Sequence, residues 1–121
     1  MLSSLMPEFM LLIRNEIDHQ AGWSAERYVQ FLKDRETYMS KLKEGGKLLA
    51  AQSLVKEGMI VSHNGEEWNV RPMRSKGEVQ VGYCHIIAKD MDEAIEIAKG
   101  NPEFAHGEKV RIEIRPVQTG E

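Results

Sequence analysis

Apolar and polar positions along the chain follow helical spacing in some stretches and strand spacing in others. Residues 8–14 form a short continuous apolar run, which is typical of a strand covered on both faces. Residues 25–44 place apolar side chains at helical spacing, which predicts a long helix that begins after Ser24 and ends at Gly45-Gly46. The apolar stripe of this helix consists of Tyr28, Leu32, Met39 and Leu42.

Further strands and a hairpin are predicted downstream. Residues 47–55 and 109–117 return to strand periodicity, and residues 78–89 form the clearest strand. Asn64-Gly65 lies between two β-prone runs. This dipeptide favours a tight hairpin turn in which both residues take positive φ.

A second, shorter helix is predicted after the strand at residues 78–89. Asp90 and Glu93 have the spacing of a capping box, which marks a helix N-terminus. Gly100-Asn101-Pro102 is expected to stop the helix. Its buried side is expected to consist of Ala94, Ile95, Ile97 and Ala98.

The order of these elements is β-α-β, then the hairpin, then β-α-β. This order predicts an α+β fold: a ferredoxin-like antiparallel sheet with two helices on one face and a β-hairpin insertion. Residues 8–118 would form a single domain, and residues 1–7 a flexible N-terminal tail.

The face of the sheet that the helices leave uncovered must contact water or a partner. In residues 78–89, strict alternation would place Val79, Val81, Tyr83, His85 and Ile87 on one side. It would place the following residues on the other side: Gln80, Gly82, Cys84, Ile86 and Ala88. Neither side is plainly polar, which favours a homodimer formed face to face.

Composition narrows the classes of partner. The 121-residue chain has a net charge of −3, which argues against nucleic-acid binding through a broad basic surface. No apolar run approaches the roughly 20 residues that span a bilayer, so no membrane association is expected. The single cysteine, Cys84, cannot form an internal disulfide, which favours a cytoplasmic location. The histidines lack close metal-ligand spacing, and we expect neither a metal nor a cofactor.

A set of short motifs runs through most of the chain. They include "FMLLI" from residue 9, "LKEGGKL" from residue 42, "GYCHIIAKDMDEA" from residue 82 and "HGEKVRIEIRPV" from residue 106. Together these motifs resemble the YCII-related family, in the branch of the DGPF-domain proteins. The resemblance implies a dimeric α/β barrel, in which two ferredoxin-like sheets pack against each other.

The resemblance implies little about activity. Most members have no established role, and some relatives are dehydrochlorinase- or isomerase-type enzymes of aromatic degradation. Counted back from Gly82-Tyr83, the Asp-Gly-Pro-Phe signature falls on residues 70–73, where this chain has Val-Arg-Pro-Met and lacks the aspartate. In the YciI-type branch a helix histidine falls at the position of Arg35, so that general base is also absent here.

Arg35 falls near the centre of the apolar stripe of the main helix. A charge there must be paired or reach solvent, because a lone buried charge is very costly. We therefore expect one of two roles for Arg35. It either has a structural role, as an ion pair with Glu113 or with a side chain that extends to solvent, or it binds an anionic ligand.

We accordingly expect a cleft between the sheet and the main helix that binds a small anionic or aromatic ligand. The expected ligand-binding residues are Arg35, Tyr38, Tyr83, Glu113 and Arg115. An alternative is a lyase- or isomerase-type enzyme on small aromatic or carboxylic acids, with His106 as the acid–base group. His106 can instead be a turn histidine that forms a hydrogen bond with the backbone. If side chains fill the cleft, the protein would be an interaction module without a ligand site. His19 and His63 are expected to contribute little.

Overall fold

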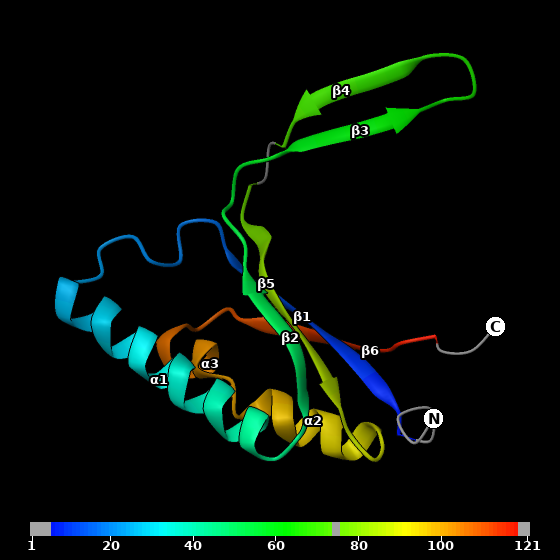
Figure 1. The fold of residues 1–121 in the computed structure, drawn as a ribbon. Helices are drawn as coiled ribbons and strands as arrows, with labels where there is room; N and C mark the ends of the chain where they lie inside the picture. The colour runs from blue at the N-terminus through cyan, green and yellow to red at the C-terminus, as the bar shows by residue number, and fades with distance from the viewer. Residues whose placement is uncertain (1–5, 74–75, 119–121) are drawn as a thin grey trace.

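The computed structural model describes residues 6–73 and 76–118, and its fold is α+β (Figure 1). Residues 1–5 of the predicted N-terminal tail lie outside the described residues. One sheet has the strand order β2-β5-β1-β6, and all neighbouring strands in it are antiparallel. Its strands are β1 (Glu8–Glu16), β2 (Leu48–Ser53), β5 (Glu78–Ile87) and β6 (Arg111–Pro116).

The helices lie on one face of this sheet (Figure 1). They are α1 (Ala25–Glu44), α2 (Met91–Lys99) and α3 (Pro102–His106). The first two helices were predicted, but α3 was not. Gly100 ends α2 as expected, whereas Asn101 caps a new helix whose first residue is Pro102. Proline suits that position because its missing N–H is not needed in the first helical turn.

Both predicted N-caps are confirmed. The Ser24 Oγ accepts a hydrogen bond from the Arg27 N–H (3.1 Å), and the Asp90 Oδ1 accepts one from the Glu93 N–H (2.9 Å). The Glu93 carboxylate accepts from the Lys89 N–H (2.8 Å) rather than from that of Asp90. The second half of the capping box is therefore displaced by one residue.

The core lies between the sheet and the helices. Its buried side chains come from β1, β5, α2 and the residue after β5: Phe9, Leu11, Ile13, Val79, Val81, Cys84, Ile86, Ala88, Ala94 and Ala98. Burial of a large aliphatic or aromatic side chain contributes about 1.5–3 kcal/mol. Burial also raises the pKa of the Cys84 thiol to about 11, so the thiol stays neutral at neutral pH.

A β-bulge in β5 contradicts the strict alternation expected for this strand. Ile13 of β1 pairs with Gly82 and the next residue, Arg14, pairs with Gln80, which leaves Val81 as an extra residue. Val81 and Gly82 are both buried. The side chains before the bulge therefore change face relative to the prediction, and Val79 joins the core side.

The opposite face of the sheet, here called the open face, carries apolar and charged side chains together. Leu12 pairs with Tyr83 on one side and with Glu113 on the other, and residues in register share a face. Near the end of the sheet where β1 finishes, Glu78 accepts hydrogen bonds from Arg111 and Arg14. These bonds lower the pKa of the Glu78 carboxyl to about 2.

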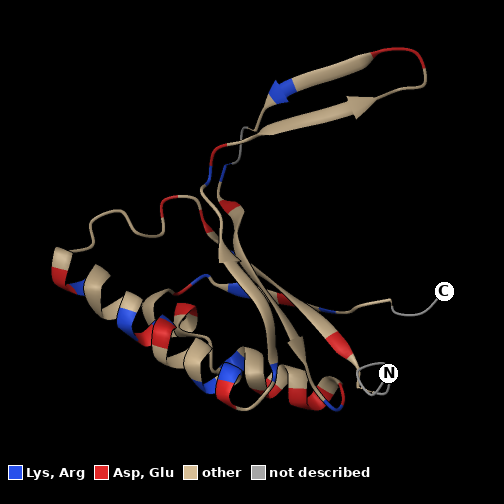
Figure 2. Cartoon of the chain, viewed as in Figure 1, with Lys and Arg blue, Asp and Glu red and all other residues tan. Residues whose placement is uncertain are grey.

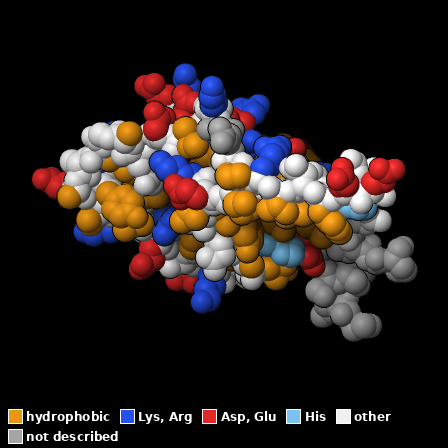
Figure 3. All heavy atoms as spheres, turned by 90° about the horizontal axis from the view of Figure 1, so that it is seen from above, with side chains coloured by type: hydrophobic (Ala, Val, Ile, Leu, Met, Phe, Trp, Pro, Cys, Tyr) orange, Lys and Arg blue, Asp and Glu red, His pale blue; other side chains and the backbone are white. Residues whose placement is uncertain are grey.

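The strands β3 (Met59–His63) and β4 (Trp68–Pro72) form a hairpin that extends away from the sheet (Figure 1). All residues of both strands are exposed, and Figure 3 shows hydrophobic side chains gathered along the hairpin. The turn differs from the prediction. The loop spans residues 64–67, only Gly65 takes a positive φ (99°), and the Asn64 Oδ1 accepts from the N–H groups of Glu66 and Glu67.

Charged residues of both signs are interspersed along α1 and α2 (Figure 2). In the described part of the chain, no helix has the length and apolar character that a bilayer crossing requires.

Candidate functional site

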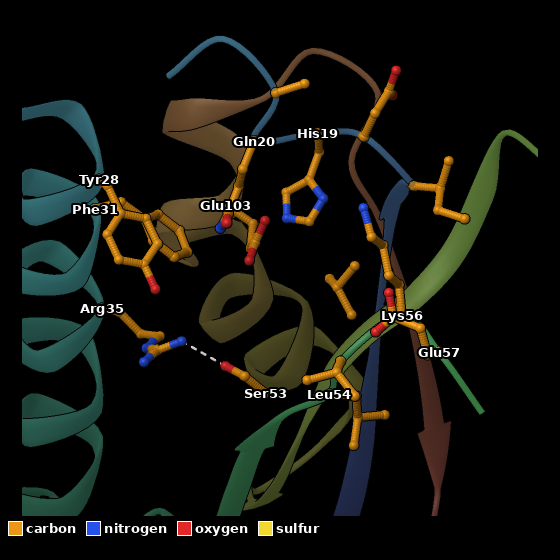
Figure 4. A pocket seen from close by; sticks show the side chains of 15 residues that line it. His19, Gln20, Tyr28, Phe31, Arg35, Ser53, Leu54, Lys56, Glu57 and Glu103 are labelled. Carbon is orange, nitrogen blue, oxygen red and sulfur yellow. Dashed lines mark hydrogen bonds between the residues drawn. The ribbon is translucent and has the colours of Figure 1, made fainter. Parts of the chain in front are cut away.

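A cavity of about 500 Å³ opens between the first half of α1, the loop after β1 and the segment after β2 (Figure 4). This volume lies in the range of small-molecule sites, about 300–1,000 Å³. Its apolar wall includes Ile17, Phe31, Leu54 and Val81. Its polar side chains include His19, Tyr28, Arg35, Ser53, Lys56 and Glu103.

Arg35 has an unusual environment for a half-buried cation. One guanidinium nitrogen, Nη1, donates a hydrogen bond to the Ser53 Oγ (2.5 Å), and the Cζ lies 5.8 Å from the centroid of the Phe31 ring. Among the residues that the structure describes, no carboxylate forms an ion pair with Arg35. A guanidinium carries five N–H donors, so most of its donors are available to a ligand.

A smaller cavity of about 210 Å³ adjoins the first, between α1 and the sheet. Four residues line both cavities: Arg35, Ser53, Val81 and Glu103. Arg35 and Glu103 therefore stand where the two cavities meet, and a ligand that contacts them can extend into either one.

His19 is held by the backbone of the loop after β1. The ring Nδ1 of His19 lies 2.9 Å from the carbonyl oxygen of Glu16, and the backbone N–H of His19 donates to the same oxygen (3.0 Å). Because a carbonyl only accepts, Nδ1 carries the hydrogen, and a neutral imidazole then has its lone pair on Nε2. The ring points into the cavity (Figure 4).

Glu103 is contributed by α3, and its carboxylate also points into the cavity (Figure 4). Its Oε1 accepts a hydrogen bond from the Nδ2 of Asn15 (3.1 Å), a β1 side chain that is only 3% exposed. The N–H of Glu103 donates to the Oδ1 of Asn101 (2.8 Å), the cap of α3. The backbone and the carboxylate of Glu103 are thus both fixed.

Two of the predicted ligand-binding residues come from α1, but only Arg35 lines the cavities. The Tyr38 hydroxyl donates to the carbonyl oxygen of Ile97 (2.7 Å), and burial raises the pKa of Tyr38 above its ordinary value. Tyr38 therefore stays protonated and ties α1 to α2.

The other three predicted ligand-binding residues lie on the open face. Tyr83 and Glu113 both pair with Leu12, and Arg115 pairs with Met10. Tyr83 also borders the smaller cavity, but its register directs the side chain away from α1. The sheet separates these residues from Arg35, and the ion pair between Arg35 and Glu113 does not form.

His106 lies outside the Arg35 cavity. Its Nε2 is 2.8 Å from the Oδ2 of Asp34, and its ring packs against Phe31 and Trp23, with centroids 5.4 and 5.7 Å apart. The hydrogen bond from His106 lowers the pKa of Asp34. His106 thus fastens the end of α3 to α1, and the structure does not bring it together with Arg35 in one cavity.

Sequence reasoning gave His19 little weight and did not single out Glu103. His19 lies in a polar loop without periodicity, and Glu103 follows a Gly-Asn-Pro segment that was interpreted only as a helix stop. The sequence did contain one usable signal: Asn101-Pro102 has the cap and first-turn residues of a helix N-terminus.

Among the described residues, no three histidine, cysteine, aspartate or glutamate side chains are grouped so as to hold a metal ion. No protein-family model matches the chain, and no curated protein sequence matches it.

Proposed function

We propose that the protein binds a small anionic ligand, with an aromatic or aliphatic part, in the cavity between α1 and the sheet. The observation that carries this proposal is Arg35. It is half-buried at the junction of two cavities, and among the described residues its polar partner is the Ser53 hydroxyl rather than a carboxylate. A carboxylate or phosphate group would supply the missing charge partner.

The chemistry of the cavity supports this ligand class. The planar guanidinium matches the two oxygens of a carboxylate or phosphate, and such charge-assisted hydrogen bonds are stronger than neutral ones. Phe31 and Leu54 offer apolar contact to the rest of the ligand. Lys56 adds a second cation to a lining that also contains three carboxylates, those of Asp18, Glu57 and Glu103. Small-molecule sites commonly combine apolar walls with a few such polar groups.

We also propose that the chain is a cytoplasmic, YCII-related protein with a ferredoxin-like sheet, which dimerises through the open face as in a dimeric α/β barrel. The strand order β2-β5-β1-β6 and the helices on one face support the ferredoxin-like assignment. Leu12 and Tyr83, which are only partly buried on the open face, support the dimer. The buried thiol of Cys84 agrees with a reducing environment.

A thermal-shift screen with benzoate, phenylacetate, phosphate and phenol tests the ligand class. At about 100 times the dissociation constant, a ligand stabilises its protein by about 2.7 kcal/mol, which raises the melting temperature by several degrees. We expect at least one anion to stabilise the wild type and Arg71→Ala, which removes an exposed arginine from the hairpin. We expect Arg35→Ala to lose this stabilisation.

Arg35→Lys refines the test, because it keeps the charge but loses the planar fork, and we expect an intermediate shift. Equal stabilisation of the wild type and Arg35→Ala would refute the anion site. The absence of any stabilisation of the wild type by the four compounds would also count against it.

A further inference from the structure

Three polar groups from separate parts of the chain point into the cavity: the guanidinium of Arg35, the imidazole of His19 and the carboxylate of Glu103 (Figure 4). They come from α1, the loop after β1 and α3. A cation that can hold an anion, together with a base and a carboxylate in the same cavity, is a set of groups that can transfer protons to and from a bound acid.

His19 differs from the other histidines. The Nε2 of His85 and that of His106 each lie 2.8 Å from a carboxylate oxygen, and His63 is exposed on the hairpin. In His19 the Nδ1 donates a hydrogen bond to the backbone carbonyl of Glu16, and among the described residues Nε2 has no protein partner. The loop thus holds the imidazole with its basic nitrogen unoccupied at a cavity of ligand size.

Glu103 supplies the complementary charge. The Asn15 amide donates to its carboxylate and holds it in place, and the carboxylate shares the cavity with the imidazole. A nearby negative charge stabilises an imidazolium. Glu103 would therefore stabilise His19 after His19 has accepted a proton, as a positioning and electrostatic residue.

We propose that this site catalyses keto–enol proton transfer in small 2-oxo acids with an apolar or aromatic tail. The proposal rests on the proposed function, because Arg35 must hold the carboxylate. The Nε2 of His19 takes a proton from the carbon next to the carbonyl. The C–H electron pair becomes a carbon–carbon double bond, and the carbonyl π pair moves onto oxygen.

The enolate then takes a proton back, either on carbon from the imidazolium or on oxygen from water. Return to carbon gives the keto acid, and protonation on oxygen gives the enol, after which the imidazolium loses its proton to solvent. No oxidant, reductant or further reactant is needed. In D₂O the imidazolium exchanges its proton, so the reaction replaces hydrogen at C3 of the 2-oxo acid with deuterium.

Proton NMR of 2-oxo-4-phenylbutanoate in D₂O measures this exchange. We expect the wild type to accelerate the loss of the C3 signal at least tenfold over buffer. His19→Gln should lower the catalysed rate about 100-fold or more, since general base catalysis contributes about 10²–10⁴. The same variant should keep the thermal shift caused by the acid. His63→Gln, which changes an exposed hairpin histidine, is the matched control and should retain the full rate.

Two further variants separate a catalytic from a structural role. His19→Ala should regain exchange activity when imidazole is added, which a purely structural loss would not allow. Glu103→Gln should bind the acid but exchange it more slowly than the wild type.

The proposal is overturned if the wild type binds the acid without accelerating exchange, or if His19→Gln keeps the full rate, and both results leave the anion site intact. If the acid neither stabilises the wild type nor exchanges on it, the anion site fails for this acid as well.

Discussion

At the residue scale, Glu78 joins three strands of the sheet. Its Oε2 accepts from the Nε of Arg111 (2.6 Å) and its Oε1 from the Nε of Arg14 (2.8 Å), so β5 is tied to both β6 and β1. The bonds from Arg111 and then Arg14 lower the pKa of Glu78 from 4.5 to about 2. Exposed ion pairs contribute little individually, but a carboxylate shared by two arginines has a distinct pH signature.

The Glu78→Gln variant should reveal this signature. The folded pKa of about 2 lies below the ordinary 4.5, so the contribution of Glu78 to stability is complete above pH 4.5 and declines as the pH falls toward 2. Urea unfolding should therefore show the wild type more stable than the variant at about pH 6, with a difference that shrinks by about pH 3. Glu36→Gln, which removes an exposed carboxylate from α1, controls for the loss of one surface charge. A difference that stays constant with pH would contradict this role.

Of the three side chains used in the proton-transfer proposal, the sequence singled out only Arg35. Arg35 could be singled out because a charge in an apolar helical stripe needs a local explanation. His19 and Glu103, in contrast, are polar residues in polar stretches, so the sequence around them gives no reason to single them out. Their importance depends on the folded loop and on α3, which bring both of them to the cavity that Arg35 lines.

At the element scale, the pairing of β5 with β2 depends on Gly82. A Cβ at this position would lie 2.8 Å from the backbone oxygen of Gln52 in β2, closer than van der Waals contact allows. Because the obstacle is backbone, it can move only if the pairing of β2 with β5 shifts. Gly82 is therefore required for the close approach of these two strands.

Gly82→Ala should accordingly destabilise the protein. We expect the free energy of unfolding to fall by about 1–3 kcal/mol, the usual cost of forcing extra atoms into a packed region. Gly45→Ala is the control, since Gly45 has a φ of −79° and the nearest atom to a new Cβ is 3.4 Å away. Its effect should stay within about 0.5 kcal/mol. Chemical denaturation monitored by circular dichroism measures both, and equal stability of the two variants would refute the argument.

Most elements could be predicted from local pattern, with α3 as the exception. The predicted helix at 25–44 matches α1, and the predicted strands agree with β1, β2, β5 and β6 to within a few residues at their ends. Helix α3 has only five residues, which is too short to show an apolar stripe. Two interactions hold α3 in place: its Asn101 cap and the hydrogen bond from His106 to Asp34 of α1. The bond to α1 is a tertiary contact, which the local sequence does not reveal.

At the scale of the whole molecule, the two faces of the sheet have different roles in our proposals. The helix-covered face forms the core and the cavity, whereas the open face would form the dimer. Leu12 lies on β1, which is flanked by β5 and β6, and it is only partly buried. A charge at this position would have to be desolvated in a face-to-face contact, which is unfavourable without a partner.

Leu12→Arg should therefore produce a monomer. We expect light scattering at micromolar concentration to give the mass of two chains for the wild type and of one chain for Leu12→Arg. Val29→Arg is the control: Val29 is 48% exposed on α1, away from the open face, so this variant should remain dimeric. Circular dichroism confirms that each variant is folded. A wild type with the mass of one chain would remove the dimer from the proposal.

The sequence by itself determined the order of the elements, the caps and the long helix, because these depend on residues within a few positions of each other. Only the tertiary structure decided which side chains share a face, since one extra residue at Val81 exchanges the two sides of β5. It also decided the site. His19, Arg35 and Glu103 are far apart along the chain, and they line one cavity because α1 and α3 pack on the same face of the sheet.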